Sequence, residues 1–160
     1  AAAKGFAWGK ELPCCGVSTL LAMAQNLRHT DATIVCAMDA RRNQVYNAVF
    51  RAEKGQLQRL CDDRAIGLAE LAEELKNDKS EKIIVGDGAK LCYNYLQQAG
   101  ISCRLAPPEL QMQNAVGVAL CAEAAAAAGE TVSAHQLVPV YLRLSQAERE
   151  REARLAAQNP

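Results

Sequence analysis

The chain has 160 residues, half of them apolar, and its 18 basic and 18 acidic side chains give a net charge of zero. This length suits one domain with a substantial core. The balanced charge argues against a protein that grips nucleic acid unaided, and no apolar run reaches the roughly 18 residues of a membrane span. These features predict a cytoplasmic globular protein without a membrane segment.

Seven cysteines are many, but their placing argues against a disulfide framework. The count is odd, Cys14 and Cys15 are adjacent, and most of the others sit inside apolar patterns. No signal-peptide pattern opens the sequence, so we expect reduced, mostly buried thiols in a reducing cytosol. The only histidines, His29 and His135, are far apart and no CxxC pair occurs. We therefore expect no metal site.

The first 30 residues predict a helix, a short strand and a second helix. Residues 1–9 read as a helix that Gly9 ends in the left-handed conformation. Residues 13–17 read as a strand without a sequence neighbour to pair with. Ser18 is a natural N-cap for a helix that continues to about Leu27.

The stretch at residues 33–62 predicts an antiparallel meander. Residues 33–38 are apolar and β-branched, and the polar residues 39–43 break the run. A second extended run starts at Gln44, in which Asn47 is the polar exception, and a turn at residues 54–55 leads into a third run. Three strands joined by two short turns are typical of a meander.

The chain after the meander alternates between helix and strand. Helices are predicted at residues 68–77, for about ten residues after the GDG turn of residues 86–88, at residues 111–128 and at residues 145–157, where Ser145 and Glu148 form a capping box. Strands are predicted at residues 82–85 and 101–105. The buried stripe of the helix after residue 88 is expected to comprise Leu91, Cys92, Tyr95 and Ala99.

The element order from residue 33 is β-β-β-α-β-α-β-α, followed by a last helix. It matches one ribonuclease H-like half of the actin and sugar-kinase superfamily. The predicted fold class is therefore α/β, with a mixed sheet that contains the meander and is flanked by helices.

Several short motifs admit both a functional and a structural interpretation. Asp39-Ala40-Arg41 could pair an acid with a basic binder, but a hairpin turn is favoured. Residues 86–88 follow a strand and open a helix, where phosphate often binds, yet they lack both common phosphate-loop patterns, and a strand-to-helix turn is favoured. Cys14 and Cys15 are better explained as strand residues on opposite faces than as a redox pair. The arginines of residues 145–157 alternate with glutamates, which favours a solvated helix.

Four segments carry a family resemblance. They are residues 16–20 (GVSTL), 37–41 (AMDAR) with Val45-Tyr46, 86–89 (GDGA) and 139–143 (PVYLR). In this order and spacing they resemble the TsaB/YeaZ family, bacterial tRNA threonylcarbamoyladenosine biosynthesis proteins that are also labelled glycoproteases. The resemblance spans nearly the whole chain.

The resemblance implies an actin-like fold of two ribonuclease H-like lobes, of which this chain is a fragment that lacks most of the first lobe. Residues 1–30 would be the remnant of the first lobe, residues 33–144 the second lobe, and residues 145–160 a C-terminal helix and tail.

The resemblance also implies a non-catalytic scaffold that pairs with the catalytic paralogue TsaD and the ATPase TsaE, can pair with itself, and meets tRNA only through the complex. It implies no catalytic residue and no cofactor in this chain. The residues that would contribute to the partner interface are Lys4, Phe6, Ala7 and Trp8. The alternatives are a nucleotide-binding enzyme of the actin and sugar-kinase superfamily and a glycoprotease-like peptidase.

Overall fold

The structure is a computed structural model that describes residues 1–143. The helix expected at residues 145–157, with its capping box, lies outside the described residues. The helices are α1 (Ala2–Trp8), α2 (Thr19–Ala24), α3 (Leu68–Leu75), α4 (Ala89–Gln98) and α5 (Ala115–Ala127), with 3₁₀ turns η1 (Gln25–Leu27) and η2 (Pro108–Leu110). The strands are β1 (Ala32–Asp39), β2 (Gln44–Glu53), β3 (Gln56–Arg59), β4 (Arg64–Gly67), β5 (Lys82–Val85) and β6 (Arg104–Leu105).

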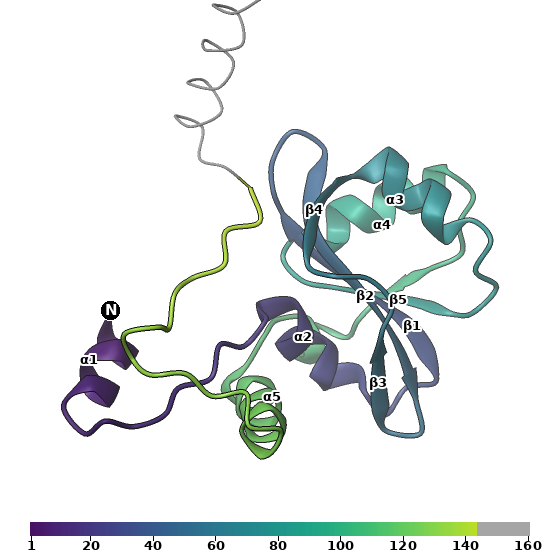
Figure 1. Cartoon of the computed structure of the whole chain (residues 1–160). Helices are drawn as coiled ribbons and strands as arrows, with labels where there is room; N and C mark the ends of the chain where they lie inside the picture. Colours follow the sequence, from purple (N-terminus) through teal and green to yellow (C-terminus); the bar gives the residue numbers. More distant parts are fainter. Residues whose placement is uncertain (144–160) are drawn as a thin grey trace, which may run out of the picture.

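A mixed sheet with β1 at its centre forms the middle layer (Figure 1). The strand order is β3-β2-β1-β5-β6. The strand β2 runs antiparallel to β1, whereas β5 and β6 continue the sheet in parallel. The meander of β1, β2 and β3 is confirmed.

The sequence pattern did not reveal β4. It pairs with residues 44–47 of β2, while β3 pairs with residues 50–53 of the same strand. The chain bends away from the sheet between them, so two short strands share one long neighbour.

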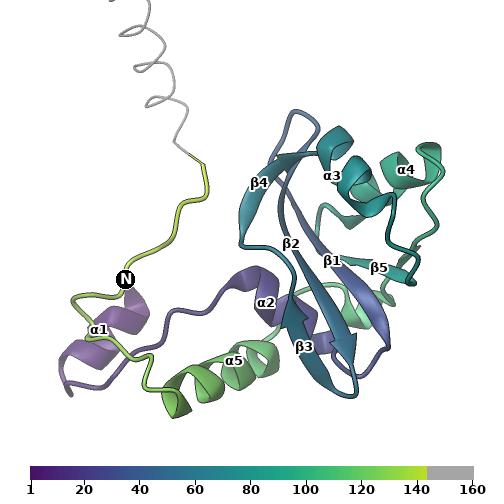
Figure 2. The same ribbon diagram turned by 45° about the vertical axis from the view of Figure 1, so that its right-hand side comes forward.

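Helices cover both faces of the sheet, as Figures 1 and 2 show. On one face, α3 and α4 pack on Val35, Val49 and Ile84. On the other face, α2 packs on Ile34, Phe50 and the other strand residues whose side chains point to that face. The helix α5 packs against α2. The alternation of inward side chains along β1 therefore supplies both cores from one strand.

The helix α5 approaches α2 more closely than a side chain would allow. A Cβ at Gly117 would lie 2.3 Å from the carbonyl oxygen of Ala22. The α5 helix begins at Ala115 and not near residue 111, because the Asn114 side chain accepts a hydrogen bond from the Gly117 amide at 2.8 Å and caps it there.

The polar exception in β2 is explained by its partners. Asn47 is fully buried, its Nδ2 donates to the Cys36 carbonyl at 2.8 Å, and its Oδ1 accepts from two nitrogens of Arg64 at 3.4 Å. Arg64 in turn pairs with Glu74 of α3, and this hydrogen bond raises the pKa of the Arg64 guanidinium. Asn47 thus ties β1, β2, β4 and α3 together.

The expected strand at residues 13–17 is wrong. Of residues 13–17, only Cys14 pairs with another described segment. It forms an antiparallel bridge to Val132 with two backbone hydrogen bonds of 2.8 Å. Pro13 has no amide hydrogen to donate, and the loop that contains Val132 pairs with this segment at one residue only. Cys14 and Cys15 are therefore not strand residues.

Other boundaries also differ from the expectation. Gly9 has φ −66°, a right-handed helical value, so α1 does not end on a left-handed glycine. The buried stripe of α4 runs through Ala89, Cys92 and Leu96, which are all fully buried. Of the stripe expected from the sequence, Cys92 is therefore confirmed, whereas Leu91 and Ala99 are exposed and Tyr95 is half-buried. The strand predicted at residues 101–105 is shorter in the structure, where β6 covers only Arg104–Leu105.

All seven cysteines are free thiols, as expected, but fewer are buried than expected. Cys36, Cys92 and Cys121 are buried, while Cys14, Cys15, Cys61 and Cys103 are half-buried. Burial raises the pKa of the Cys92 thiol to about 12 and also raises that of Cys36.

Candidate functional site

The segments singled out by sequence meet in space around one groove. Residues 16–20 and 138–143 form its two sides, and Met38, Tyr46 and Asp63 complete the lining. The groove has a volume of about 680 Å³. Three of the four segments that carry the family resemblance therefore line one concave surface, although more than 100 residues separate the first of them from the last.

The fourth segment, residues 86–89, lies directly behind the end of β1. Gly86 has φ +116°, and a Cβ there would lie 2.2 Å from the carbonyl oxygen of Ala37. The Gly88 amide donates to that same oxygen at 3.0 Å. Both glycines are needed because the β5–α4 turn crosses the backbone of β1 with no space for a side chain.

The carboxylates of Asp87 and Asp39 both accept hydrogen bonds from backbone amides. The Oδ1 of Asp87 accepts from the Asp39 amide at 3.1 Å, and the Oδ1 of Asp39 accepts from the Arg41 amide at 2.7 Å. The Arg41 side chain is 87% exposed and pairs with Asp39 at 3.1 Å. The turn interpretations of residues 39–41 and 86–88 are confirmed.

Arg143 connects the C-terminal side of the groove to the same hairpin. Its Nη1 donates to the carbonyl oxygen of Ala40 at 2.8 Å. This hydrogen bond holds the extended segment 138–143, in which Val140 and Tyr141 are each 83% exposed, next to the end of β1.

The polar groups of the groove are joined in a short chain. Ser18 caps α2 by accepting from the Leu21 amide at 3.1 Å, and its hydroxyl donates to Oδ2 of Asp63 at 2.5 Å. Asp63 also pairs with Arg59 at 2.6 Å, and the Arg59 guanidinium lies 4.7 Å from the centre of the Phe50 ring. The hydroxyl, the carboxylate and the guanidinium thus satisfy one another.

Neither histidine nor cysteine is among the described residues that line the groove, so Ser18 has no imidazole base beside it. Among residues 1–143, no three side chains of metal-ligating type gather closely enough to hold an ion. The helices of that same range include none that is long and apolar enough to cross a bilayer.

The four residues expected at a partner interface lie on α1 (Figure 2), and none of them lines the groove. Phe6 and Trp8 are 69% and 62% exposed, whereas Ala7 is buried. Lys4 donates to the His135 carbonyl at 3.3 Å, and the Trp8 and His135 rings meet edge-on with centroids 6.0 Å apart. The face of α1 that carries Lys4 and Trp8 therefore contacts the loop after α5, whereas Phe6, two residues before Trp8, lies on another side of the helix.

Sequence reasoning missed the groove as a unit. Ser18 was expected only as a helix cap, and Asp63 follows no periodic pattern that would mark it. The available signal was the resemblance itself, because the quoted segments are the ones that line the groove or support it.

The fold and the groove first define a class of protein. The sheet order, with one antiparallel strand beside a parallel half, is that of a ribonuclease H-like lobe of the actin-like superfamily. A solved structure described as an uncharacterized protein with similarity to peptidase YeaZ, from Pseudomonas aeruginosa, superposes with a TM-score of 0.72 at 25% identity, over 89% of this chain and 64% of that chain.

Sequence comparison narrows the class to a family. The family model "TsaD: tRNA N6-adenosine threonylcarbamoyltransferase" matches residues 1–151. The Bacillus subtilis and Escherichia coli proteins named tRNA threonylcarbamoyladenosine biosynthesis protein TsaB are 31% and 33% identical, over 91% and 88% of this chain. The chain belongs to this TsaD family and, within it, to the TsaB/YeaZ group. It spans 62% of the length of each of these two relatives.

Proposed function

We propose that the chain acts as a non-catalytic scaffold in tRNA threonylcarbamoyladenosine modification, with a TsaD-like paralogue and a TsaE-like ATPase as partners in the cytoplasm. The observation that carries this proposal is the match to two proteins named for this biosynthesis over about nine-tenths of the chain. We also propose that residues 1–30 belong to a first lobe, residues 33–144 to a second lobe and residues 145–160 to a C-terminal extension.

The chemistry of the groove supports the non-catalytic role. Ser18 and Asp63 are occupied by a helix cap and by Arg59, and Asp39 and Asp87 by backbone amides. A phosphotransferase needs free phosphate-binding donors and a carboxylate that is free to hold a metal ion. Ser18 and Asp63 are bound to other groups of this chain, and Asp39 and Asp87 are not among the residues that line the groove.

For the partner contact we propose the exposed aromatic side chains of α1. Phe6 and Trp8 are large and exposed, and Lys4 and Trp8 fasten this short helix to the loop after α5. Aromatic side chains on a supported element are typical of residues that dominate binding energy at interfaces.

The test is a reconstituted reaction with TsaD, TsaE, ATP and unmodified tRNA, in which TsaB is omitted, replaced by this chain, or replaced by E. coli TsaB. Nucleoside mass spectrometry then measures threonylcarbamoyladenosine. We expect this chain at tens of micromolar to raise the product above the omission control, and a double change of Phe6 and Trp8 to Ser to abolish the gain. A matched change of the exposed Leu91 of α4, which does not line the groove, to Ser should leave it intact.

Equal product with and without the chain, while E. coli TsaB is active, would contradict the scaffold role. The peptidase alternative rests on the description of the Pseudomonas neighbour and on the 2.5 Å contact of Ser18 with Asp63. Cleavage of a casein substrate that is lost on changing Ser18 to Ala would establish that alternative instead.

A further inference from the structure

The turn between β1 and β2 has a strained backbone. Arg41, Arg42 and Asn43 have φ values of 65°, 56° and 56°, so three successive residues other than glycine lie in the left-handed region. Asparagine tolerates this conformation, but in arginine the Cβ crowds the following carbonyl oxygen. Strain of this kind persists only where the surrounding structure enforces it, and it gathers at functional sites. The two arginines are therefore the unusual feature of this turn.

The surrounding structure holds the turn from three sides. The Leu68 amide, at the start of α3, donates to the Asn43 carbonyl oxygen at 3.1 Å. Asp87, in the turn after β5, accepts from the last backbone amide of β1 at 3.1 Å. Arg143 donates to the Ala40 carbonyl oxygen at 2.8 Å. Three separate segments thus fix a conformation that glycine would adopt without strain.

Packing does not explain the arginines at these positions. Neither side chain belongs to one of the two hydrophobic cores. The Arg41 side chain is 87% exposed, and its ion pair within residues 1–143 is with Asp39. Arg42 is exposed, and no residue of that range accepts a hydrogen bond from its guanidinium. A rigid turn therefore presents two guanidinium groups to solvent, one of them unpaired within the described chain.

The groove wall beside the turn carries related side chains. Met38 and Tyr46 line the groove at the base of the turn, and Tyr141 and Arg143 line its other side. The hydrogen bond from Arg143 to Ala40 joins that side to the turn. Arginine, tyrosine and methionine are the residue types enriched at protein–protein interfaces. The turn and the groove wall thus form one surface with the composition of a protein-binding site.

We infer that the turn at residues 40–43 recognises carboxylates on the surface of a protein partner. A guanidinium is planar and pairs with a carboxylate through two parallel hydrogen bonds. RNA fits less well, because Asp39 and Asp87 lie at the base of the turn and the net charge of the chain is zero. A polyanion would meet these carboxylates without long-range attraction. The inference involves no residue of α1 and does not depend on the proposed function.

The Arg42→Gly variant separates strain from recognition. Glycine adopts φ 56° freely, so Tm should rise by about 2 °C. Hexaglutamate is the acidic probe, and its binding is followed through the NMR shifts of backbone amides, which should move at residues 40–43 in the parent. The variant should bind it roughly threefold more weakly.

Two further variants complete the test. Arg42→Gln removes the charge but keeps the strain, so it should weaken hexaglutamate binding without the rise in Tm. Asn43→Gly is the matched control, because it keeps both arginines and should bind as the parent does. A lower Tm for Arg42→Gly would contradict the strain on which the inference rests. Equal binding by the parent and Arg42→Gln, or no shift at residues 40–43, would overturn the recognition.

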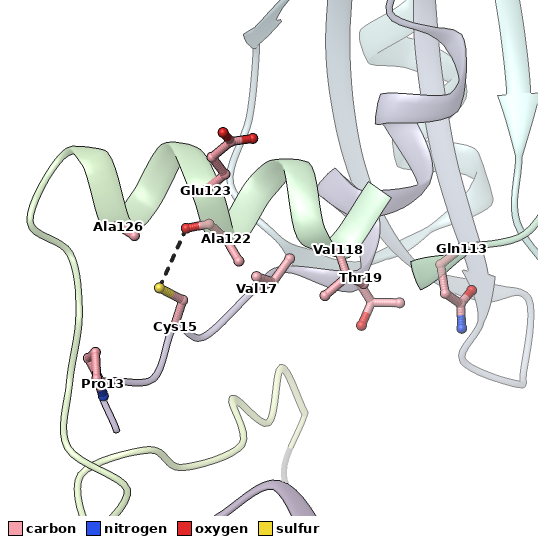
Figure 3. Close-up of a pocket in the computed structure, with 9 residues that line it drawn as sticks. All are labelled: Pro13, Cys15, Val17, Thr19, Gln113, Val118, Ala122, Glu123 and Ala126. Carbon is pink, nitrogen blue, oxygen red and sulfur yellow. Dashed lines mark hydrogen bonds between the residues drawn. The ribbon is translucent and has the colours of Figure 1, made fainter. Parts of the chain in front are cut away.

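Hexaadenylate at equal ionic strength tests the RNA alternative. If it shifts the turn more than hexaglutamate does, the turn recognises phosphate and the protein partner is excluded. A second alternative is the groove of about 580 Å³ between α5 and the segment before α2, which Val17 and Val118 line (Figure 3). Hexaglutamate shifts confined to that groove would also overturn the inference, because the peptide would then bind without the arginines.

Discussion

Gly86 lies where two chain segments cross with no space for a side chain. The turn after β5 crosses the end of β1 with φ +116° at this residue, and a Cβ would lie 2.2 Å from the Ala37 carbonyl oxygen. A clash between a Cβ and a backbone atom at this distance cannot be relieved by rotating a side chain. At the scale of the residue, the fold depends on a few such positions.

Changing Gly86 to Ala should lower the free energy of unfolding by about 2 kcal/mol or more, because it adds both strain and a backbone clash. Urea denaturation would measure the loss. Gly9 is the matched control, since it has φ −66° and a Cβ added there would meet no neighbouring atom within 4 Å. Equal effects at the two glycines would show that the crossing is not as close as described.

Asp78 makes stability depend on pH in the acid range. Burial raises the pKa of its carboxyl, but hydrogen bonds from the Ser80 amide and hydroxyl and from Thr33, with Lys82 nearby, outweigh this and lower it below 3.8. A lowered folded-state pKa stabilises the fold above the unfolded value and loses that stabilisation as the pH falls through the folded value.

The Asp78→Asn variant should therefore be less stable than the parent at pH 7, and the difference should shrink below about pH 4. Thermal unfolding from pH 7 to pH 2.5 would follow it. Glu73→Gln, at an exposed ion pair with Lys76, is the control and should change little at any pH. A gap between parent and Asp78→Asn that is constant with pH would contradict the linkage.

Elements are joined by buried polar contacts as well as by apolar cores. Asn47 links β2 to the Cys36 carbonyl of β1 and to Arg64 of β4, whose partner Glu74 lies on α3. Changing Asn47 to Ala leaves a carbonyl and a guanidinium without these partners at a buried position. The expected loss is roughly 1–3 kcal/mol.

Chemical denaturation would measure this loss against Asn94→Ala on the exposed side of α4. Because Asn47 joins β4 to the central strands β1 and β2, hydrogen exchange should also rise in β4 and less in β5. Unchanged exchange in β4 would show that Arg64 finds other partners.

The thiols report on the molecule as a whole. Cys36, Cys92 and Cys121 are buried, and because the thiolate is the reactive form, the pKa of about 12 at Cys92 slows its reaction further. In the native protein we expect four thiols to react with a disulfide reagent much faster than these three, and all seven to react in guanidinium chloride. Seven fast thiols without denaturant would show that the cores open readily.

Partner binding also belongs to this scale. We expect this chain to bind a TsaD protein more weakly than E. coli TsaB does, because it spans 62% of that relative and an interface smaller than about 1,000 Å² is seldom stable. Calorimetric titration of both proteins into TsaD would compare them. Equal affinities would place the whole contact within this chain.

The sequence alone determined the elements that depend on neighbours along the chain. Periodicity and turn residues predict the meander of β1 to β3 and the helix α3. The Ser18 cap follows from a hydroxyl three residues before a free amide. The family followed from four short segments. Each secondary-structure signal depends on residues that are near one another in the chain, and the family signal depends only on the order and spacing of its four segments.

Tertiary structure alone decided what depends on distant partners. Only the fold shows that β4 shares β2 with β3, that Leu96 and not Leu91 is buried in α4, and that residues 13–17 pair at Cys14 alone. It also decided the groove, since residues 16–20 and 138–143 meet because α5 packs on α2 and the chain after α5 returns past the end of β1. Burial and pairing of this kind are properties of both partners together, and no local pattern contains the second partner.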